Sequence, residues 1–504
     1  MTGIASKELV LAGWIFILVY SSIILFFVIR GARRIENMAD YAVGNIAFSP
    51  VAVGLALAAS MTSAATFIIN PGFIALYGLS AVISYAIVLP IAAMLSLVFL
   101  TKGFRKHGNT VKALSMAQWM GTRYKNKNFA VFFAFLSLLL ITFIVLIVVG
   151  LTKVLSKTLN VDEFYILLGV VVFIFGYMMF GGANSMVYTN TIQASLMLIV
   201  AVILLGSGYE HFSNGVHGFL DKLRAIDPKL VQSTNESSFL FRDYFEIIFA
   251  QIVVGVAIVC QPHIITKSLL LKTDKDVNRY LFVGILVEMI FFMVVITGLY
   301  ARIAFPDLSI NGQALKMDGI ISAYVVGEFP VYAGLLVVLG LISAGISTLE
   351  GLIQALGTTI TADIIRPLFG DKIKNLAQSE VSINKIVIAA LAIISIWLSY
   401  DQLVNPKLSV AIFAQNGVYA YFAAAFVPIL FGMFFKNVPG IAVFSASITA
   451  VIVHFSMYYG KIAIPFSIAS GENPGVAASV AIIASLLVGA IGFVIFRGQS
   501  HANQ

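Results

Sequence analysis

The fold of this chain depends on an unusual run of residues, Leu57-Ala58-Ala59-Ser60-Met61-Thr62-Ser63-Ala64-Ala65-Thr66. These small and hydroxyl-bearing residues lie within 41–101, a charge-free stretch long enough for two membrane spans and divided near Asn70-Pro71-Gly72 and Tyr77-Gly78. An unbroken span satisfies its backbone internally, whereas a broken helix exposes carbonyl oxygens. The run therefore predicts an interrupted helix with a binding site at the interruption.

A second interruption is predicted in the seventh span. Gly255 and the triplet Gln261-Pro262-His263 interrupt an apolar helix near 247–268. Five spans separate the two interruptions, as an inverted five-plus-five repeat requires, and such paired breaks indicate the central site of a transporter. Small residues taken one at a time are better explained by close helix packing. The paired pattern favours the transporter interpretation.

The composition of the chain is that of an integral membrane protein. Of its 504 residues, 60% are hydrophobic and 11% charged, and the mean hydropathy is +0.99. A soluble protein of this length needs more polar surface. Apolar stretches of about 20 residues, with the 164–209 stretch divided at Gly181-Gly182-Ala183-Asn184, predict about thirteen transmembrane helices. Clustered His, Cys or acidic residues are missing, so we expect no enzyme, and the single Cys260 excludes an internal disulfide.

The distribution of charge predicts the orientation. The net charge of +8 fits a positive-inside bias better than nucleic-acid binding. With the N-terminus outside, 20 of the 31 Lys and Arg fall on the cytoplasmic side, and the N-terminal segment lacks the features of a cleaved signal peptide. We expect a multi-pass protein of the plasma (inner) membrane with a cytoplasmic C-terminus. Its partners would be a small-molecule solute and the lipid bilayer, with no nucleic acid and no obligatory protein partner.

The run Leu341-Ile342-Ser343-Ala344-Gly345-Ile346-Ser347-Thr348-Leu349 carries a second chemical signal. Ser347 and Thr348 follow Ala344 by three and four residues, so on a helix all three lie on one face. The carbonyl of Ala344 and both hydroxyls can then converge on one point. A hard cation such as sodium prefers oxygen ligands of this kind, and carbonyls of the broken second span could complete the set.

Several motifs occur in a characteristic order along the chain. They are Ala-Asp-Tyr-Ala-Val-Gly at 39–44, the small-residue break at 58–66, Gly181-Gly182 followed by Tyr-Thr-Asn-Thr-Ile-Gln at 188–193, Gln-Pro-His-Ile-Ile at 261–265, Ala344-x-x-Ser347-Thr348, and Ala-Gln-Asn-Gly-Val-Tyr-Ala at 414–420 leading to Phe-Val-Pro at 426–428. Each motif alone is weak, but the ordered set is specific. Over nearly its full length the chain resembles the sodium:solute symporter family, which contains proline, pantothenate, acetate and sugar symporters.

The resemblance implies an all-α membrane protein with a five-plus-five inverted-repeat core of the LeuT type. An extra N-terminal helix would occupy 1–35, the first repeat 36–210, an extracellular loop 211–243, the second repeat 244–435, and two peripheral C-terminal helices 436–504. The coupling ion implied is Na+. Its ligands would be the main-chain carbonyls of Ala59, Thr62 and Ala344 and the hydroxyls of Ser347 and Thr348. Hydroxyls bonded back to their own helix are the alternative explanation for that pair.

Two polar residues stand out as candidates along an ion path. Relatives commonly carry an aspartate where this chain has Asn190, which favours a single sodium ion per cycle. Glu288 is an intramembrane acid and is therefore a functional candidate, with pairing inside the bundle as the alternative, and the same holds for Glu350. His263 is interpreted as a structural or gating residue, because no companion metal ligand lies nearby in the sequence.

The solute is expected at the two helix breaks, where half-helix N-termini favour an anionic group. Candidate contacts are Ser63, Thr66, Gln261 and Gln415, with interhelical hydrogen bonds as the alternative role. The motifs indicate different substrates: the run at 63–67 resembles acetate-type relatives, while Gln-Pro-His resembles the proline branch.

Taken together, the sequence predicts a sodium-coupled secondary active symporter that imports a small organic solute by alternating access. The favoured solutes bear a carboxylate: a monocarboxylate, an amino acid such as proline, or pantothenate. A sodium/sugar symporter and a transporter-like membrane solute sensor are the alternatives. The chain shows no repeated filter motif of the kind that a channel would need.

Overall fold

The computed structural model describes residues 7–45, 48–111, 113–271, 273–310, 312–370, 376–405 and 409–496, and this part of the chain is nearly all helical. The α-helices are α1 (Lys7–Ala32), α2 (Met38–Val43), α3 (Pro50–Met61), α4 (Asn70–Tyr77), α5 (Leu79–Val82), α6 (Leu89–Val111), α7 (Met116–Arg123), α8 (Lys127–Leu136), α9 (Ile141–Leu159), α10 (Glu163–Gly206), α11 (Gly215–Ile226), α12 (Gln251–Ile258), α13 (Pro262–Ile265), α14 (Asp274–Met293), α15 (Thr297–Ala304), α16 (Ile320–Glu328), α17 (Val331–Thr359), α18 (Arg366–Phe369), α19 (Leu376–Val404), α20 (Val410–Phe434), α21 (Gly440–Gly460) and α22 (Pro474–Phe496).

Shorter elements connect or extend these helices. The π-helical turns are η1 (Ala65–Ile69), η2 (Ile83–Val88), η6 (Phe245–Ala250) and η10 (Ile360–Ile365), and the 3-10 turns are η3 (Ser137–Leu140), η4 (Tyr209–Phe212), η5 (Pro228–Val231), η7 (Thr266–Leu270), η8 (Val294–Ile296) and η9 (Met317–Gly319). The strands β1 (Ser309–Ile310) and β2 (Gln313–Ala314) form a small antiparallel hairpin.

The described residues contain ten helices long and apolar enough to cross a membrane, or twelve when each of two bent helix pairs is counted as a span. The predicted all-α membrane fold is thereby confirmed. The predicted total of about thirteen is not confirmed, because it requires α10 to cross the membrane twice.

The backbone of α10 changes direction at Gly182. A straight helix of its 44 residues would be about 66 Å long, roughly twice the thickness of the hydrocarbon core. Gly182 has φ 56° and ψ −167°, a conformation that favours glycine, and it interrupts the helix there. This is the position at which the Gly181-Gly182 pair predicts a break.

Both predicted helix interruptions are present. The axis bends by 54° between α3 and the η1–α4 segment, and by 57° between the η6–α12 and α13–η7 segments. At the second bend Pro262 forces the preceding Gln261 into an extended conformation with ψ 137°. At the first bend Thr62 is extended, and the Ser63 hydroxyl accepts a hydrogen bond from the Ala65 amide in place of a helical bond.

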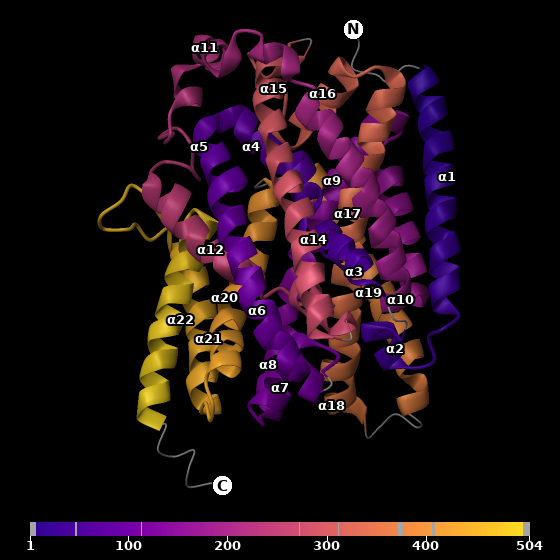
Figure 1. Cartoon of the computed structure of the whole chain (residues 1–504), viewed down its shortest axis with the longest axis vertical. Coiled ribbons are helices and arrows are strands. Elements are labelled where there is room, and N and C mark those ends of the chain that lie inside the picture. The colour runs from indigo at the N-terminus through magenta and orange to yellow at the C-terminus, as the bar shows by residue number, and fades with distance from the viewer. Residues whose placement is uncertain are drawn as a thin grey trace.

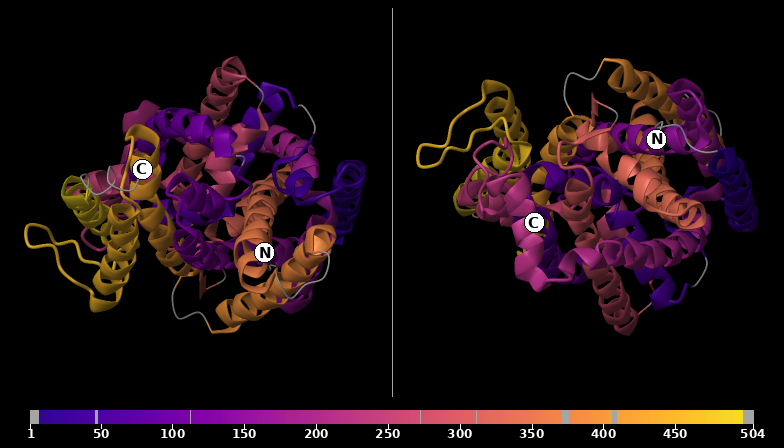
Figure 2. Two further views of the ribbon diagram at one scale, coloured as in Figure 1. Left: turned by 90° about the horizontal axis from the view of Figure 1, so that it is seen from below. Right: turned by 90° about the horizontal axis from the view of Figure 1, so that it is seen from above.

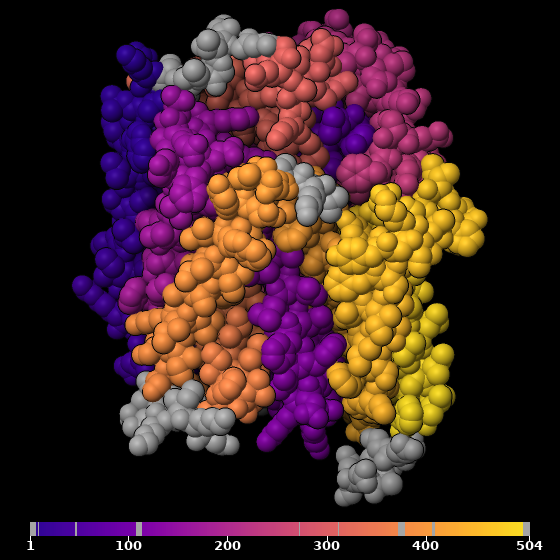
Figure 3. All heavy atoms as spheres, turned by 180° about the vertical axis from the view of Figure 1, so that it is seen from behind, coloured from indigo at the N-terminus to yellow at the C-terminus, as the bar shows by residue number. Residues whose placement is uncertain are grey.

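Helix α17 forms the centre of the bundle, and α1 and α22 form its flanks (Figure 1). In the span that contains α17, 94% of the most apolar 18-residue segment is buried. The corresponding share for α1 is 22%. Views along the bundle axis and from behind place indigo α1 and the yellow C-terminal helices on opposite sides (Figures 2 and 3). Exposed apolar residues of α1, such as Leu18 and Phe26, then face lipid. The division into two inverted repeats stays a prediction.

The two ends of the bundle differ in the elements that they carry. In Figure 1, α1 begins at the top, where α11 also lies, whereas α2, α7 and α18 lie at the bottom and α22 ends there. The segment predicted to be extracellular therefore shares an end with the start of the chain. Which end faces the cytoplasm stays a prediction. Five basic residues used to predict it lie outside the described residues: Lys112, Lys272, Lys372, Lys374 and Arg497.

Candidate functional site

The end of α3 supplies carbonyl oxygens without helical partners. The amide of Thr62 donates to the Ala58 carbonyl, which is the last helical hydrogen bond of α3. The carbonyls of Ala59 and Ser60 therefore lack the usual donors four residues ahead. Buried carbonyls in this state require other partners.

Hydroxyls of α17 provide these partners. Ser347 Oγ lies 2.7 Å from the Ala59 carbonyl oxygen and 3.1 Å from that of Ala344. Thr348 Oγ1 lies 3.4 Å from the Ser60 carbonyl oxygen and 3.3 Å from that of Ala344. We call these three carbonyl and two hydroxyl oxygens the oxygen cluster. The structure brings four of the five predicted sodium ligands into it, together with Ser60.

The oxygen cluster is chemically suited to a hard monovalent cation. Its residues are fully buried or nearly so, and all of its oxygens are uncharged. Among the described residues there is no group of three or more His, Cys, Asp or Glu that could hold a metal ion, so a transition-metal site is not indicated there. Both hydroxyls also bond back to Ala344 in their own helix, so each one bridges α17 and α3.

The main-chain carbonyl of Thr62 is the fifth predicted ligand, and the side chain of this residue faces a different helix. Its hydroxyl donates to Glu288 Oε2 of α14 at 2.8 Å, and both side chains are fully buried. Within the described part of the chain, no hydrogen bond joins Thr62 to α17, and Glu288 Oε1 has no partner. The predicted ion-path residue Glu288 therefore lies at the α3 break.

Asn190 lies beside the oxygen cluster. Its amide nitrogen donates to Ser60 Oγ at 3.1 Å, and its Oδ1 has no hydrogen-bond partner among the described residues. The side chain is fully buried. Ser60 is thus in contact with Asn190 through its side chain and with Thr348 through its carbonyl. The predicted ion-path residue is one hydrogen bond away from the cluster.

Glu350 pairs inside the bundle. Tyr177 and Thr189 donate to its two carboxylate oxygens at 2.5 and 2.6 Å. These donors lie on either side of Gly182 in α10, so the carboxylate ties both parts of α10 to α17. This contact is the pairing inside the bundle that the sequence leaves open as the alternative role of Glu350.

The predicted solute contacts lie in three places. Ser63 and Thr66 are together at the α3 break, where the Thr66 amide donates to the Ser63 carbonyl at 3.0 Å. Gln261 begins α13, which contacts both α3 and α17. Gln415 lies on α20 and its amide reaches the Tyr85 hydroxyl at 3.4 Å. Among the described residues no side-chain hydrogen bond links Gln415 to the other three.

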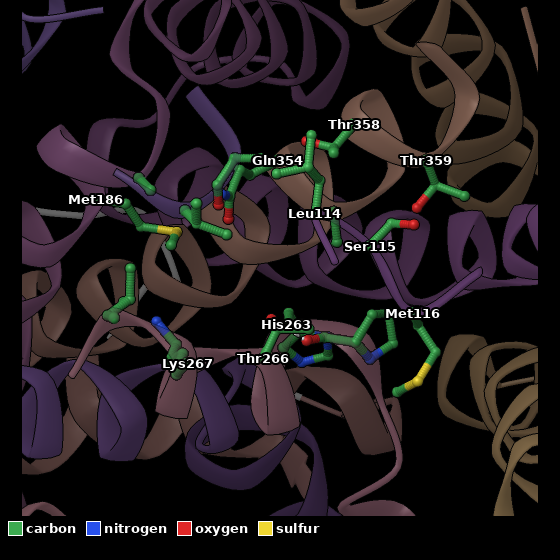
Figure 4. Close-up of a pocket in the computed structure, with 16 residues that line it drawn as sticks. Leu114, Ser115, Met116, Met186, His263, Thr266, Lys267, Gln354, Thr358 and Thr359 are labelled. Atoms are coloured by element: carbon green, nitrogen blue, oxygen red, sulfur yellow. Dashed lines mark hydrogen bonds between the residues drawn. The ribbon is translucent and has the colours of Figure 1, made fainter. Parts of the chain in front are cut away.

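A small cavity of about 30 Å³ lies beyond the breaks, lined by parts of α2, α10, α13, η7, α17 and the 114–116 segment (Figure 4). Lys267 and His263 line it. Both are buried, and neither the amine nor either imidazole nitrogen has a hydrogen-bond partner in the described residues. The prediction of a structural or gating role for His263 is not tested by this placement.

Sequence reasoning missed Ser60 and Lys267. Ser60 lies in the small-residue run, but nothing in the sequence distinguishes it from its neighbours Ala59 and Thr62. Lys267 enters the sequence prediction only as one of the basic residues on the cytoplasmic side. Its position one short helix beyond Pro262 is the available signal, because a basic residue so close to a predicted break is unusual in a membrane span.

The chain matches a known protein family over most of its length. The model of the sodium:solute symporter family matches residues 41–450. The sodium/pantothenate symporter of Haemophilus influenzae is 28% identical over 58% of this chain and 61% of that protein, so the match spans about three fifths of its length. The Escherichia coli sodium/pantothenate symporter is 25% identical over 82% of this chain and 83% of that protein.

A solved structure matches the fold. It is the substrate-bound, outward-open state of a Na+-coupled sialic acid symporter, with a TM-score of 0.76, 17% identity, and coverage of 95% of this chain and 97% of that chain. The family resemblance drawn from the motifs is confirmed by the family match. The chain belongs to the sodium:solute symporter family, and its coupling ion is Na+.

Proposed function

We propose that this protein is a sodium-coupled secondary active symporter that imports a small carboxylate-bearing solute by alternating access. One observation carries the proposal: the hydroxyls of Ser347 and Thr348 meet the free carbonyls at the end of α3 in a buried, uncharged cluster. Neutral oxygens can replace the water shell of Na+ without a fixed negative charge that would hold the ion too tightly for release.

The residues proposed to hold Na+ are those of the oxygen cluster together with the Thr62 carbonyl. Ala59, Ser60 and Thr62 come from the broken helix, and Ala344, Ser347 and Thr348 come from α17. An ion shared by the two helices favours whichever state of the carrier brings them together. If the solute binds that same state better, each ligand increases the affinity for the other, which is the thermodynamic requirement for coupling.

Pantothenate is the first solute to test, followed by monocarboxylates and by amino acids such as proline. Two relatives are named as sodium/pantothenate symporters, and pantothenate carries a carboxylate. Ser63, Thr66 and Gln261 are proposed contacts because they lie at the helix breaks, where backbone amides are free to bind an anionic group. Gln415 would contact the solute from α20.

The protein is proposed to act in the plasma (inner) membrane with its N-terminus outside. The end that carries α7 and α18 would then face the cytoplasm, which fits the basic residues Arg123 and Arg366 in these helices.

Uptake into proteoliposomes tests the function. Purified protein is reconstituted, and accumulation of labelled pantothenate, lactate, acetate, proline and glucose is measured with an inward gradient of sodium or of choline. We expect a carboxylate to accumulate only with sodium. Equal uptake in choline would contradict sodium coupling, and accumulation of glucose alone would favour the sugar symporter.

A further inference from the structure

A buried lysine lines the cavity of Figure 4. Lys267 is 2% exposed, and its amine has no hydrogen-bond or ion-pair partner among the described residues. Figure 4 shows Lys267, His263 and Thr266 on one side of the cavity, opposite Gln354 and Met186. A buried, unpaired ammonium group is costly unless an anion accompanies it. The cavity therefore offers a place where an anion would be stabilised.

The lining of the cavity is complementary to an anion. None of the described residues that line it is Asp or Glu. Both nitrogens of His263 and the Thr358 hydroxyl are buried and lack partners in the described part of the chain. The carboxylate of Glu350 accepts hydrogen bonds from Tyr177 and Thr189 and forms no ion pair with Lys267 among the described residues, although its charge acts on the amine from a distance. Three side chains without partners, Lys267, His263 and Thr358, thus line the cavity.

The cavity lies on the same face of α17 as the candidate ion site. Ser347, Gly351, Gln354 and Thr358 follow each other at intervals of three or four residues and so share a helix face. A Cβ atom at Gly351 would lie 3.2 Å from His263 Cβ, which shows that α13 packs directly on this face. One helical turn, about 6 Å along the axis, separates Ser347 from Gly351. The cavity therefore lies further along the same side of α17 than the candidate ion site.

We propose that Lys267, assisted by His263 and Thr358, forms an anion site that binds the carboxylate of the transported solute on the cytoplasmic part of its path. This inference rests on the proposed function, since it takes the carboxylate from that solute. The site attracts the solute from the helix breaks and holds it before release.

A cysteine reporter tests the site without depending on transport. Ala355 lines the cavity and is partly exposed, so Ala355→Cys is introduced in a Cys260→Ala background and its rate of modification by N-ethylmaleimide is measured in detergent. We expect lactate or pantothenate at several times its dissociation constant to slow modification by about fivefold. Lactamide and pantothenol, which lack the carboxylate, should not.

Charge variants identify the group responsible. Lys267→Gln should weaken protection by about tenfold or more, because the carboxylate loses a buried charged partner, and Lys267→Arg should retain it. Lys102→Gln, at an exposed position on α6, is the matched control and should leave protection unchanged. Undiminished protection in Lys267→Gln, or protection by chloride as strong as by the carboxylates, would overturn the proposal.

Transport kinetics separate this proposal from the proposed function. In proteoliposomes, Lys267→Gln should raise the half-saturating concentration for carboxylate exchange at the cytoplasmic face while changing the external value less than about twofold. A wild-type protein that moves no carboxylate would end the proposed function, while the labelling result still decides the inner site. A wild-type protein that transports normally, with equal changes at both faces in the variant, would contradict the inner site alone.

Discussion

Single hydroxyl groups connect the two helices at the candidate ion site. Ser347 and Thr348 each bridge a carbonyl of the interrupted α3 and the carbonyl of Ala344 in their own helix. In the hydrogen-bonded form the hydroxyl protons point at the carbonyls, whereas a cation would turn the hydroxyl oxygens toward itself. The same atoms can therefore hold the site together in either form.

Removal of one hydroxyl tests this interpretation. Thr348→Ala should abolish sodium-dependent uptake, because the ion loses one of few ligands, while expression stays intact since a lost hydrogen bond costs only about 1 kcal/mol. Thr348→Ser keeps the hydroxyl and should retain uptake. The measurement is uptake against sodium concentration in proteoliposomes. Wild-type uptake in Thr348→Ala would refute the role of this residue.

A second residue prediction concerns the stability of the Glu350 contact. Glu350 accepts from two hydroxyls, and a glutamine offers only one acceptor oxygen, so Glu350→Gln should lower the free energy of unfolding by about 1–3 kcal/mol. Tyr177→Phe removes one of the donors and should make the Gln substitution less costly. Thermal unfolding of both single variants and the double variant measures this coupling. Additive losses would show that the Tyr177 hydroxyl and the Glu350 carboxylate are not energetically coupled.

At the level of helices, the breaks were predictable and their partners were not. Pro262 and the small-residue run act on the backbone locally, so sequence alone places both bends. The hydrogen bond from Thr62 to Glu288 joins residues from distant spans and depends on how α14 packs against α3. The sequence likewise predicts one helix face containing Ala344, Ser347 and Thr348. It does not show that Ser60, rather than Thr62, supplies the carbonyl opposite Thr348.

The change of direction in α10 yields a prediction at the same scale. A Cβ atom at Gly182 would lie 2.9 Å from both the carbonyl oxygen and a ring carbon of Tyr41, and the positive φ is unfavourable for alanine. Gly182→Ala should lower the free energy of unfolding by at least about 1–2 kcal/mol. Gly176→Ala, in the same helix with no atom within 4 Å in the described structure, is the control and should be nearly neutral. Equal melting temperatures would contradict the strain.

Across the whole molecule, composition predicts the class of protein but not the number of crossings. Hydropathy identifies apolar segments of sufficient length, and ten to twelve such spans occur in the described residues. A thirteenth span requires each of the two parts of α10 to cross the membrane. The average hydropathy of the segment does not show whether they do. The positions of α1 and α22 on the flanks follow from their uniformly apolar surfaces, which need no polar partner.

The orientation of the molecule is testable by labelling. His217 of α11 and Lys127 of α8 are both exposed and belong to elements at opposite ends of the bundle. In a Cys260→Ala background, His217→Cys should react with an impermeant maleimide on intact cells, whereas Lys127→Cys should react only after permeabilisation. The reverse result would invert the proposed topology. Reaction of both on intact cells would contradict the assignment of these elements to opposite sides.

The uncharged character of the oxygen cluster has an electrical consequence. The empty oxygen cluster bears no formal charge, so its own reorientation moves no charge through the membrane field, and voltage acts on this site only when Na+ is bound. A sodium ion crossing alone gains about 2.3 kcal/mol for each 100 mV, but a monoanion travelling with it cancels that gain. Co-transport of one Na+ with a monocarboxylate would then generate no current, whereas co-transport with a zwitterion would be electrogenic.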